Sequence, residues 1–166
     1  MSEKPTQADL EVIKNQLGRT PRDVNSVSYR CPCGKAAVVT TPPRLSDGTP
    51  FPTFYYATCP KLTGAISTLE TTGMMAEMQE RLTTDPDLAQ AYKKAHFAYI
   101  AAREQVGMEV EEVSGITAGG MPDRVKCLHS LVAHSLSAGP GINPLGDEAL
   151  AALPQWWLGD SCSEGI

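Results

Sequence analysis

The pattern of apolar and polar positions predicts one helix followed by three short strands. Residues 6–17 repeat apolar side chains at helical spacing, and Gly18 ends that pattern. Three runs rich in β-branched and aromatic residues come next, at 26–31, 36–41 and 51–59. Because their connections are short, the simplest arrangement is an antiparallel meander.

The rest of the chain is helical in pattern, with proline and glycine at the boundaries. Helices are expected at 59–73, 74–85, 86–106, 122–138 and 143–153. Residues 107–121 are acidic and then glycine-rich, which predicts a long loop. The expected fold class is α+β, a small three-stranded antiparallel sheet packed with about five helices. We expect a single domain at 19–153, an N-terminal helix within 1–18 and a flexible tail at 154–166.

Composition narrows the function classes. The net charge of −5 and the pI of about 5.2 argue against a nucleic-acid-binding surface, which needs clustered Lys and Arg. No apolar window is long enough to span a membrane, and the start MSEKPTQADL lacks the apolar region of a secretory signal. We therefore expect a cytoplasmic protein. Five cysteines in that compartment point to ligands, nucleophiles or core packing rather than to disulfides.

Three cysteines are candidates for one metal site. In a meander the first and third strands end at the same edge, which brings Cys31 and Cys59 together. Cys59 precedes Pro60 at an expected helix start, where the helix dipole favours a thiolate. Cys127 would supply a third ligand from the helix at 122–138, and His134 shares its helical face.

Alternatives for the fourth ligand are His129 and Cys33. His129 lies roughly 200° around the expected helix from Cys127, so it should point away from that thiol. Cys33 belongs to the string CPCG, which lacks the two-to-four-residue spacing of a zinc knuckle. The competing interpretation, equally supported by composition, is that these cysteines are small buried apolar residues.

A second set of polar residues follows the helix at 86–106. Tyr92, His96, Tyr99 and Arg103 recur at intervals of four, three and four, which places them on one face. As a functional pocket wall, His96 would move a proton and Arg103 would hold an anion. As a core stripe, their polar tips would be satisfied by backbone groups or water.

Several strings resemble a known bacterial family. YRCPCG, DGTPFPTFYYATCP, AYKKAHFAYIAAR and GGMPDRVKCLHSLVAHSLSAGPGINPLGD are similar to the family catalogued as domain of unknown function 501, from about Leu17 to about Leu150. The resemblance implies that Cys31, Cys59, Cys127, His129 and His134 belong to the family pattern, whereas Cys33 and Cys162 do not. It implies no activity. Actinobacterial members are often encoded near a septum-formation protein and an exopolyphosphatase.

Three functions remain open from the sequence. The first is a metal or cluster protein with either zinc or an iron–sulfur centre on Cys31, Cys59 and Cys127. The second is a metal-free interaction module, linked to cell division or polyphosphate metabolism, that binds a protein partner through its C-terminal Trp-containing tail. The third is a thiol enzyme with Cys127 as nucleophile, His134 or His129 as base and Arg103 as anion holder.

Overall fold

The computed structural model describes residues 2–159 and confirms the α+β fold class. Its α-helices are α1 (Gln7–Leu17), α2 (Pro60–Glu70), α3 (Met74–Thr84), α4 (Pro86–Glu104), α5 (Leu128–Ala138) and α6 (Pro144–Ala152). Its strands are β1 (Ser26–Arg30), β2 (Ala36–Thr40) and β3 (Tyr55–Ala57), and a short 3₁₀ helix, η1, covers Glu111–Val113. The helices α1, α4 and α6 begin at residues whose side chains cap them, and in α1 Thr6 and Asp9 form a capping box.

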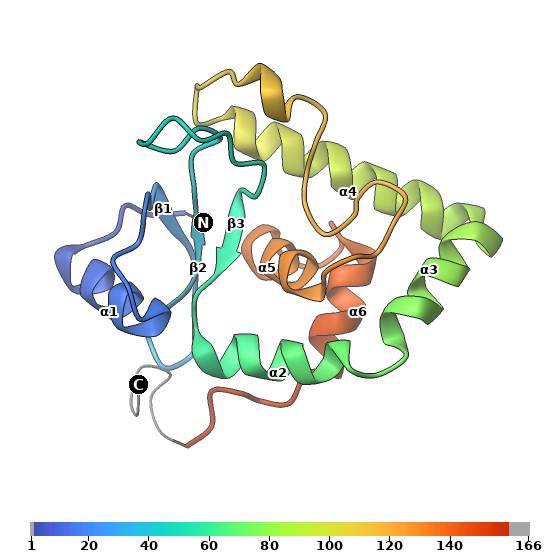
Figure 1. The fold of residues 1–166 in the computed structure, drawn as a ribbon. Coiled ribbons are helices and arrows are strands. Elements are labelled where there is room, and N and C mark those ends of the chain that lie inside the picture. The colour runs from blue at the N-terminus through green and yellow to red at the C-terminus, as the bar shows by residue number, and fades with distance from the viewer. Residues whose placement is uncertain (1, 160–166) are drawn as a thin grey trace.

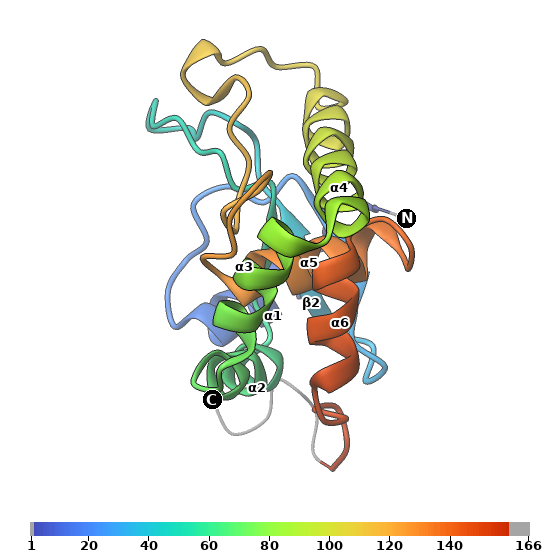
Figure 2. The same ribbon diagram turned by 90° about the vertical axis from the view of Figure 1, so that its right-hand side faces the viewer.

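The three strands form the antiparallel meander that the sequence predicts, in the order β1-β2-β3. All five residues of β2 are buried, because this central strand is covered on both faces. The helix α1 covers one face, and α5 packs against the other (Figure 1). Seen from the right-hand side of Figure 1, α3, α4 and α6 lie in front of the sheet and α1 lies behind it (Figure 2).

Two apolar clusters follow from this layering. The larger one lies between the sheet and the helices α2 to α6, around fully buried side chains such as Leu62, Tyr99 and Leu131. The smaller one lies between α1 and the opposite face of the sheet, and consists of Ile13, Val27, Ala36 and Val39. The small cluster leaves part of this face without helical cover.

The start of α5 differs from the prediction. A helix was expected from residue 122, but α5 begins at Leu128. Residues 119–126 instead form a tight turn in which the Lys126 N–H donates to the Gly119 carbonyl. Gly120 has φ +96°, and a Cβ atom there would come within 2.7 Å of the Arg124 carbonyl oxygen. Pro122 therefore lies in a loop rather than in the first turn of the helix.

The tail contacts the body as far as the structure describes it. Trp156 is buried in the larger cluster, and its ring packs edge-on against Trp157 at 4.7 Å between centroids. Cys162 and the rest of the expected tail lie outside the described residues. Binding of a protein partner through this segment stays a prediction. No described helix is both long and apolar enough to cross a membrane.

Candidate metal centre

The shortened helix places Cys127 at the N-cap of α5. Its backbone is extended, with φ −156° and ψ 115°, and its side chain does not cap its own helix. The cap comes from another element, because the Glu70 carboxylate at the end of α2 accepts the Leu128 N–H at 2.8 Å. This hydrogen bond joins the end of α2 to the start of α5, next to Cys127.

His129 lies in the same first turn and faces α2. Its Nδ1 is 3.1 Å from Glu70 Oε1, and its Nε2 is 3.3 Å from both the Thr63 carbonyl oxygen and Ser67 Oγ. Ser130 Oγ donates a long hydrogen bond of 3.8 Å to the Cys127 sulfur. Both imidazole nitrogens therefore meet oxygen atoms of α2.

Glu70, Cys127 and His129 form a group that could hold a metal ion. One ligand atom from each residue lies within 4.8 Å of the others, and all three residues are half-buried. Within residues 2–159 this is the sole group of three or more His, Cys, Asp or Glu residues with such spacing. A thiolate, an imidazole and a carboxylate are all ligands that zinc accepts.

The electrostatics of the group shift the pKa values of Cys127 and His129 in opposite directions, each toward the charged form. Burial raises the pKa of the Cys127 thiol, but hydrogen bonds from His129 and Ser130 outweigh it, so the pKa is lowered overall. The hydrogen bond to Cys127 is the largest influence on His129 and raises its pKa against the effect of burial. Glu70 adds to that increase through its own negative charge.

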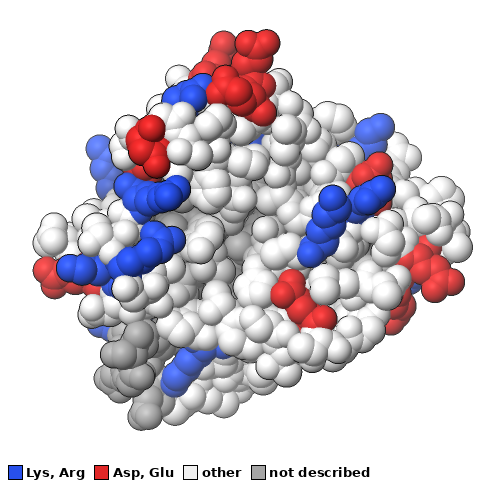
Figure 3. Space-filling view, viewed as in Figure 1, with Lys and Arg blue, Asp and Glu red and all other residues white. Residues whose placement is uncertain are grey.

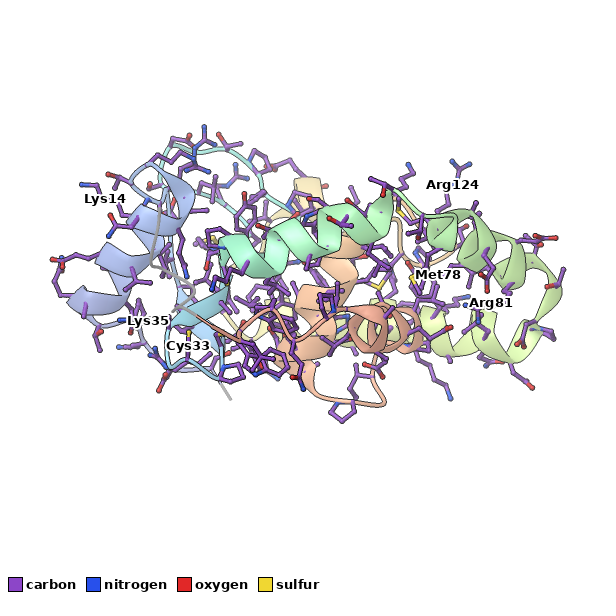
Figure 4. All side chains as sticks on the ribbon, turned by 90° about the horizontal axis from the view of Figure 1, so that it is seen from below. Lys14, Cys33, Lys35, Met78, Arg81 and Arg124 are labelled. Carbon is purple, nitrogen blue, oxygen red and sulfur yellow. The ribbon has the colours of Figure 1, made fainter. Side chains whose placement is uncertain are left out.

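The structure places Cys31 and Cys59 at the same end of the sheet, as the meander predicts. The Cys31 N–H donates to the Lys35 carbonyl on one side of β2, and the Cys59 N–H approaches the Ala37 carbonyl at 3.5 Å on the other. Both cysteines are buried in the larger cluster, and Cys59 is the N-cap of α2. Cys33 lies beside Lys35 in the turn between β1 and β2 (Figure 4).

The group that could hold a metal ion contains Cys127 but neither of the two cysteines at this end of the sheet. Cys59 precedes α2 and Glu70 ends it, and the eleven residues of that helix span about 16 Å. The metal-ligand group includes Cys127 and His129 of the sequence candidates, adds Glu70, and does not include Cys31, Cys59 or His134. The ligand set Cys31, Cys59, Cys127 and His134 stays a prediction.

His134 lies in an aromatic environment. Its ring stacks on Tyr55 at 5.6 Å and meets Tyr99 edge-on at 5.1 Å. The Asn143 Nδ2 is 3.2 Å from its Nδ1. Burial lowers the pKa of His134 to about 4. The side chain is therefore neutral at neutral pH.

The polar stripe on α4 is buried and anchors surrounding segments. The Tyr92 hydroxyl donates to the Arg124 carbonyl, and the Tyr99 hydroxyl accepts the N–H groups of Phe54 and Tyr55. Each of these contacts fixes a loop or strand end on the helix. This matches the core-stripe interpretation for the two tyrosines.

His96 and Arg103 also have partners in the fold. His96 Nδ1 is 2.9 Å from Thr117 Oγ1, and burial lowers the pKa of this histidine. Arg103 donates to the carbonyl oxygens of Pro52 at 2.7 Å and Val113 at 3.0 Å. The guanidinium holds two loops together, and catalytic roles for His96, Arg103 and His134 remain predictions.

Sequence reasoning missed Glu70, although the chain carries a signal for it. An acidic residue at the C-terminal end of a helix opposes the helix dipole. Glu70 ends α2 in this unfavourable position, so a compensating partner is expected. The partners are the first N–H of α5 and the His129 imidazole.

Comparison with known proteins gives a family without an assigned activity. The family described as "Protein of unknown function (DUF501)" matches residues 27–151. Neither the curated proteins nor the solved structures include a match to the chain. The matched range runs from the second residue of β1 to the next-to-last residue of α6 and includes all three residues of the candidate metal centre. Because the match covers most of the sequence, the chain belongs to the DUF501 family.

Proposed function

We propose that the protein binds one zinc ion through Glu70, Cys127 and His129. The observation that carries the proposal is the convergence of three different donor atoms within 4.8 Å of one another. Three protein ligands leave one position of a tetrahedral zinc ion for water or a substrate, which is the arrangement of catalytic zinc sites. The ion would join the end of α2 to the start of α5.

Local interactions support this role for each ligand. Glu70 Oε2 is held by the Leu128 N–H, so Oε1 has a fixed direction toward His129 and Cys127. The lowered pKa of Cys127 favours the thiolate, which is the form that binds metal. Zinc would compete with protons for the Cys127 sulfur and the His129 imidazole nitrogen, because metal ligands must be deprotonated.

Zinc fits the group better than an iron–sulfur cluster does. Cluster sites use mainly cysteine thiolates, whereas this group contains one thiolate, one imidazole and one carboxylate. Zinc is borderline-soft and accepts all three donor types. Of the two cofactors that the sequence leaves open, we therefore favour zinc.

The direct test is zinc affinity, measured by competition with a coloured chelator. We expect the purified chain to bind one equivalent of zinc. Cys127→Ser and His129→Gln should weaken binding by more than the roughly 10–100-fold that loss of an outer-shell partner costs. Glu70→Gln should also weaken binding, although its amide oxygen still accepts the Leu128 N–H and preserves the cap.

Matched cysteine variants provide the control. Cys33→Ser and Cys59→Ser should leave zinc affinity unchanged, because neither residue belongs to the group. If Cys59→Ser abolished binding as Cys127→Ser does, the three-cysteine set would be favoured instead. The proposal would be wrong if the ligand variants bound zinc as tightly as the parent chain, or if neither the parent chain nor any variant bound it.

Thiol chemistry is a second candidate, favoured by the paired pKa shifts of Cys127 and His129. A thiolate stabilised by an imidazolium, itself oriented by a carboxylate, is an activated nucleophile. In the metal-free chain, iodoacetamide should alkylate Cys127 faster than Cys33, and the difference should grow as pH falls below the ordinary thiol pKa. Equal rates for the two half-buried cysteines would argue against this candidate.

A further inference from the structure

A cavity lies on the face of the sheet opposite to α5 and the metal centre. It is enclosed by α1, the segment that follows α1, and the loop between β2 and β3. It has a volume of about 530 Å³, within the range of about 300–1,000 Å³ that is typical of small-molecule sites. No residue of the metal centre lines it. Its existence follows from the incomplete cover that α1 gives to this face.

The floor and walls of the cavity are apolar. Val39 and Tyr56 are direct partners across β2 and β3, so both side chains lie on the same face of the sheet. Val39 is 3% exposed at the floor beside Ile13, whereas Tyr56 is 36% exposed at the mouth. Phe51 adds a second aromatic wall. Such a surface favours a ligand with an aliphatic or aromatic body.

The rim of the cavity carries two arginine side chains. Arg19 and Arg22 both line it, and within residues 2–159 Arg19 has no ion-pair partner. Arg22 lies 4.0 Å from Asp47, and both of those side chains are more than half exposed. Asp23 is the acidic residue among those that line the cavity, and its carboxylate accepts hydrogen bonds from the Ser46 backbone N–H and hydroxyl.

The charge of this face differs from that of the whole chain. Although the net charge is −5, Lys and Arg side chains gather over α1 and the loops beside it, next to a hollow in the surface (left of Figure 3). An apolar cavity whose mouth carries two arginine side chains, of which only Arg22 has an ion-pair partner among the described residues, complements an anionic head on an apolar body.

We propose that this cavity binds a small carboxylate with an apolar body, such as a medium-chain acyl or aromatic acid. The apolar part contacts Ile13, Val39 and Phe51, and the carboxylate lies at the rim with Arg19 and Arg22. This site is independent of the zinc site, because the two lie on opposite faces of the sheet (Figure 1).

The test uses octanoate and its uncharged analogue 1-octanol, followed by backbone amide chemical shifts. Both should shift the signals of Leu17, Val24 and Phe51, and octanoate should bind more tightly. In the double variant Arg19→Gln/Arg22→Gln, octanoate should bind about tenfold more weakly, from two exposed charge pairs of modest strength, and 1-octanol should be unaffected. Added salt should also weaken the binding of octanoate, because it screens exposed charges, and should leave the binding of 1-octanol unchanged.

Two further variants keep the test decisive. Lys14 points away from the body from the exposed side of α1 and does not line the cavity, so Lys14→Gln should leave both affinities unchanged (Figure 4). Thr49→Trp, an exposed rim position, should block both molecules by filling the mouth. The proposal is overturned if octanoate shifts signals elsewhere, or if its affinity survives in both the double arginine variant and Thr49→Trp.

Discussion

His134 makes the folding stability of the chain depend on pH in a way that can be worked out from its contacts. It is 1% exposed, and its ring contacts the rings of Tyr55 and Tyr99, which also contact each other. The Asn143 side chain fixes its protonation state, because Asn143 Oδ1 accepts the Gly146 N–H at 3.0 Å. The Asn143 Nδ2 is then directed at His134 Nδ1 and must donate to it. A proton on that nitrogen would place two donors face to face.

The sign and size of the pH effect on folding stability follow from the lowered pKa of His134. An unfolded histidine binds its proton near pH 6.5, whereas burial lowers the pKa of His134 to about 4 in the folded chain. The unfolded state therefore binds more protons between these values, and the stabilisation is fully present above pH 6.5 and lost as pH falls to about 4. At about 1.4 kcal/mol per pKa unit, the loss is about 3 kcal/mol.

The perturbation is His134→Phe, which keeps an aromatic ring packed against both tyrosines but cannot titrate. At pH 7 the variant should be less stable by about 1–3 kcal/mol, because Asn143 loses an acceptor. Between pH 6.5 and 4 its free energy of unfolding should fall less steeply than that of the parent chain, so the two curves converge. Urea unfolding at several pH values measures both quantities. His96 also has a lowered pKa, but it is present in both chains and cancels in the difference. Parallel pH curves would refute the assignment of a buried neutral His134.

Three further predictions concern the fold. Asp9→Asn disrupts the capping box and the paired contact with Arg30, so the free energy of unfolding at pH 7 should fall by about 2 kcal/mol. Hydrogen bonds from Arg30 hold the pKa of Asp9 low. The difference in unfolding free energy between the variant and the parent chain should therefore narrow as pH falls below 4. Tyr99→Phe removes the acceptor of two buried N–H groups and should cost about 2 kcal/mol in urea unfolding without changing zinc affinity; an unchanged midpoint would contradict this. Arg103→Met removes the donor to two loop carbonyls. Amide hydrogen exchange in residues 107–116 should therefore accelerate, while α4 stays protected. Unchanged exchange in this loop would show that the guanidinium does not hold it.

Helix ends that carry their own capping residues could be predicted from the sequence. Asp85 accepts the N–H groups of Asp87 and Leu88, and Pro86 occupies the first helical position, as the residue types indicate. Gly18 ends α1 in the left-handed conformation. The order of the strands followed from their short connections. In each case the signal and its cause are local.

The candidate site could be predicted only in part, because its geometry depends on a contact between distant segments. Pro122 resembles a helix start, but the turn closed by Gly119 and Lys126 delays α5 to Leu128. With Cys127 in an extended conformation, the helical angle that directed His129 away from the thiol does not apply. The cap from Glu70 links residues 58 positions apart, which periodicity cannot reveal.

Cobalt(II) absorption tests the zinc proposal most directly, because cobalt takes the ligands of zinc and a cobalt–thiolate bond absorbs in the near ultraviolet. The parent chain should bind one equivalent with the band intensity of a single thiolate in tetrahedral geometry. That band should disappear in Cys127→Ser and persist in both Cys31→Ser and Cys59→Ser. A band with three-thiolate intensity that Cys31→Ser or Cys59→Ser weakens, or no thiolate band at all, would contradict a centre formed by Glu70, Cys127 and His129.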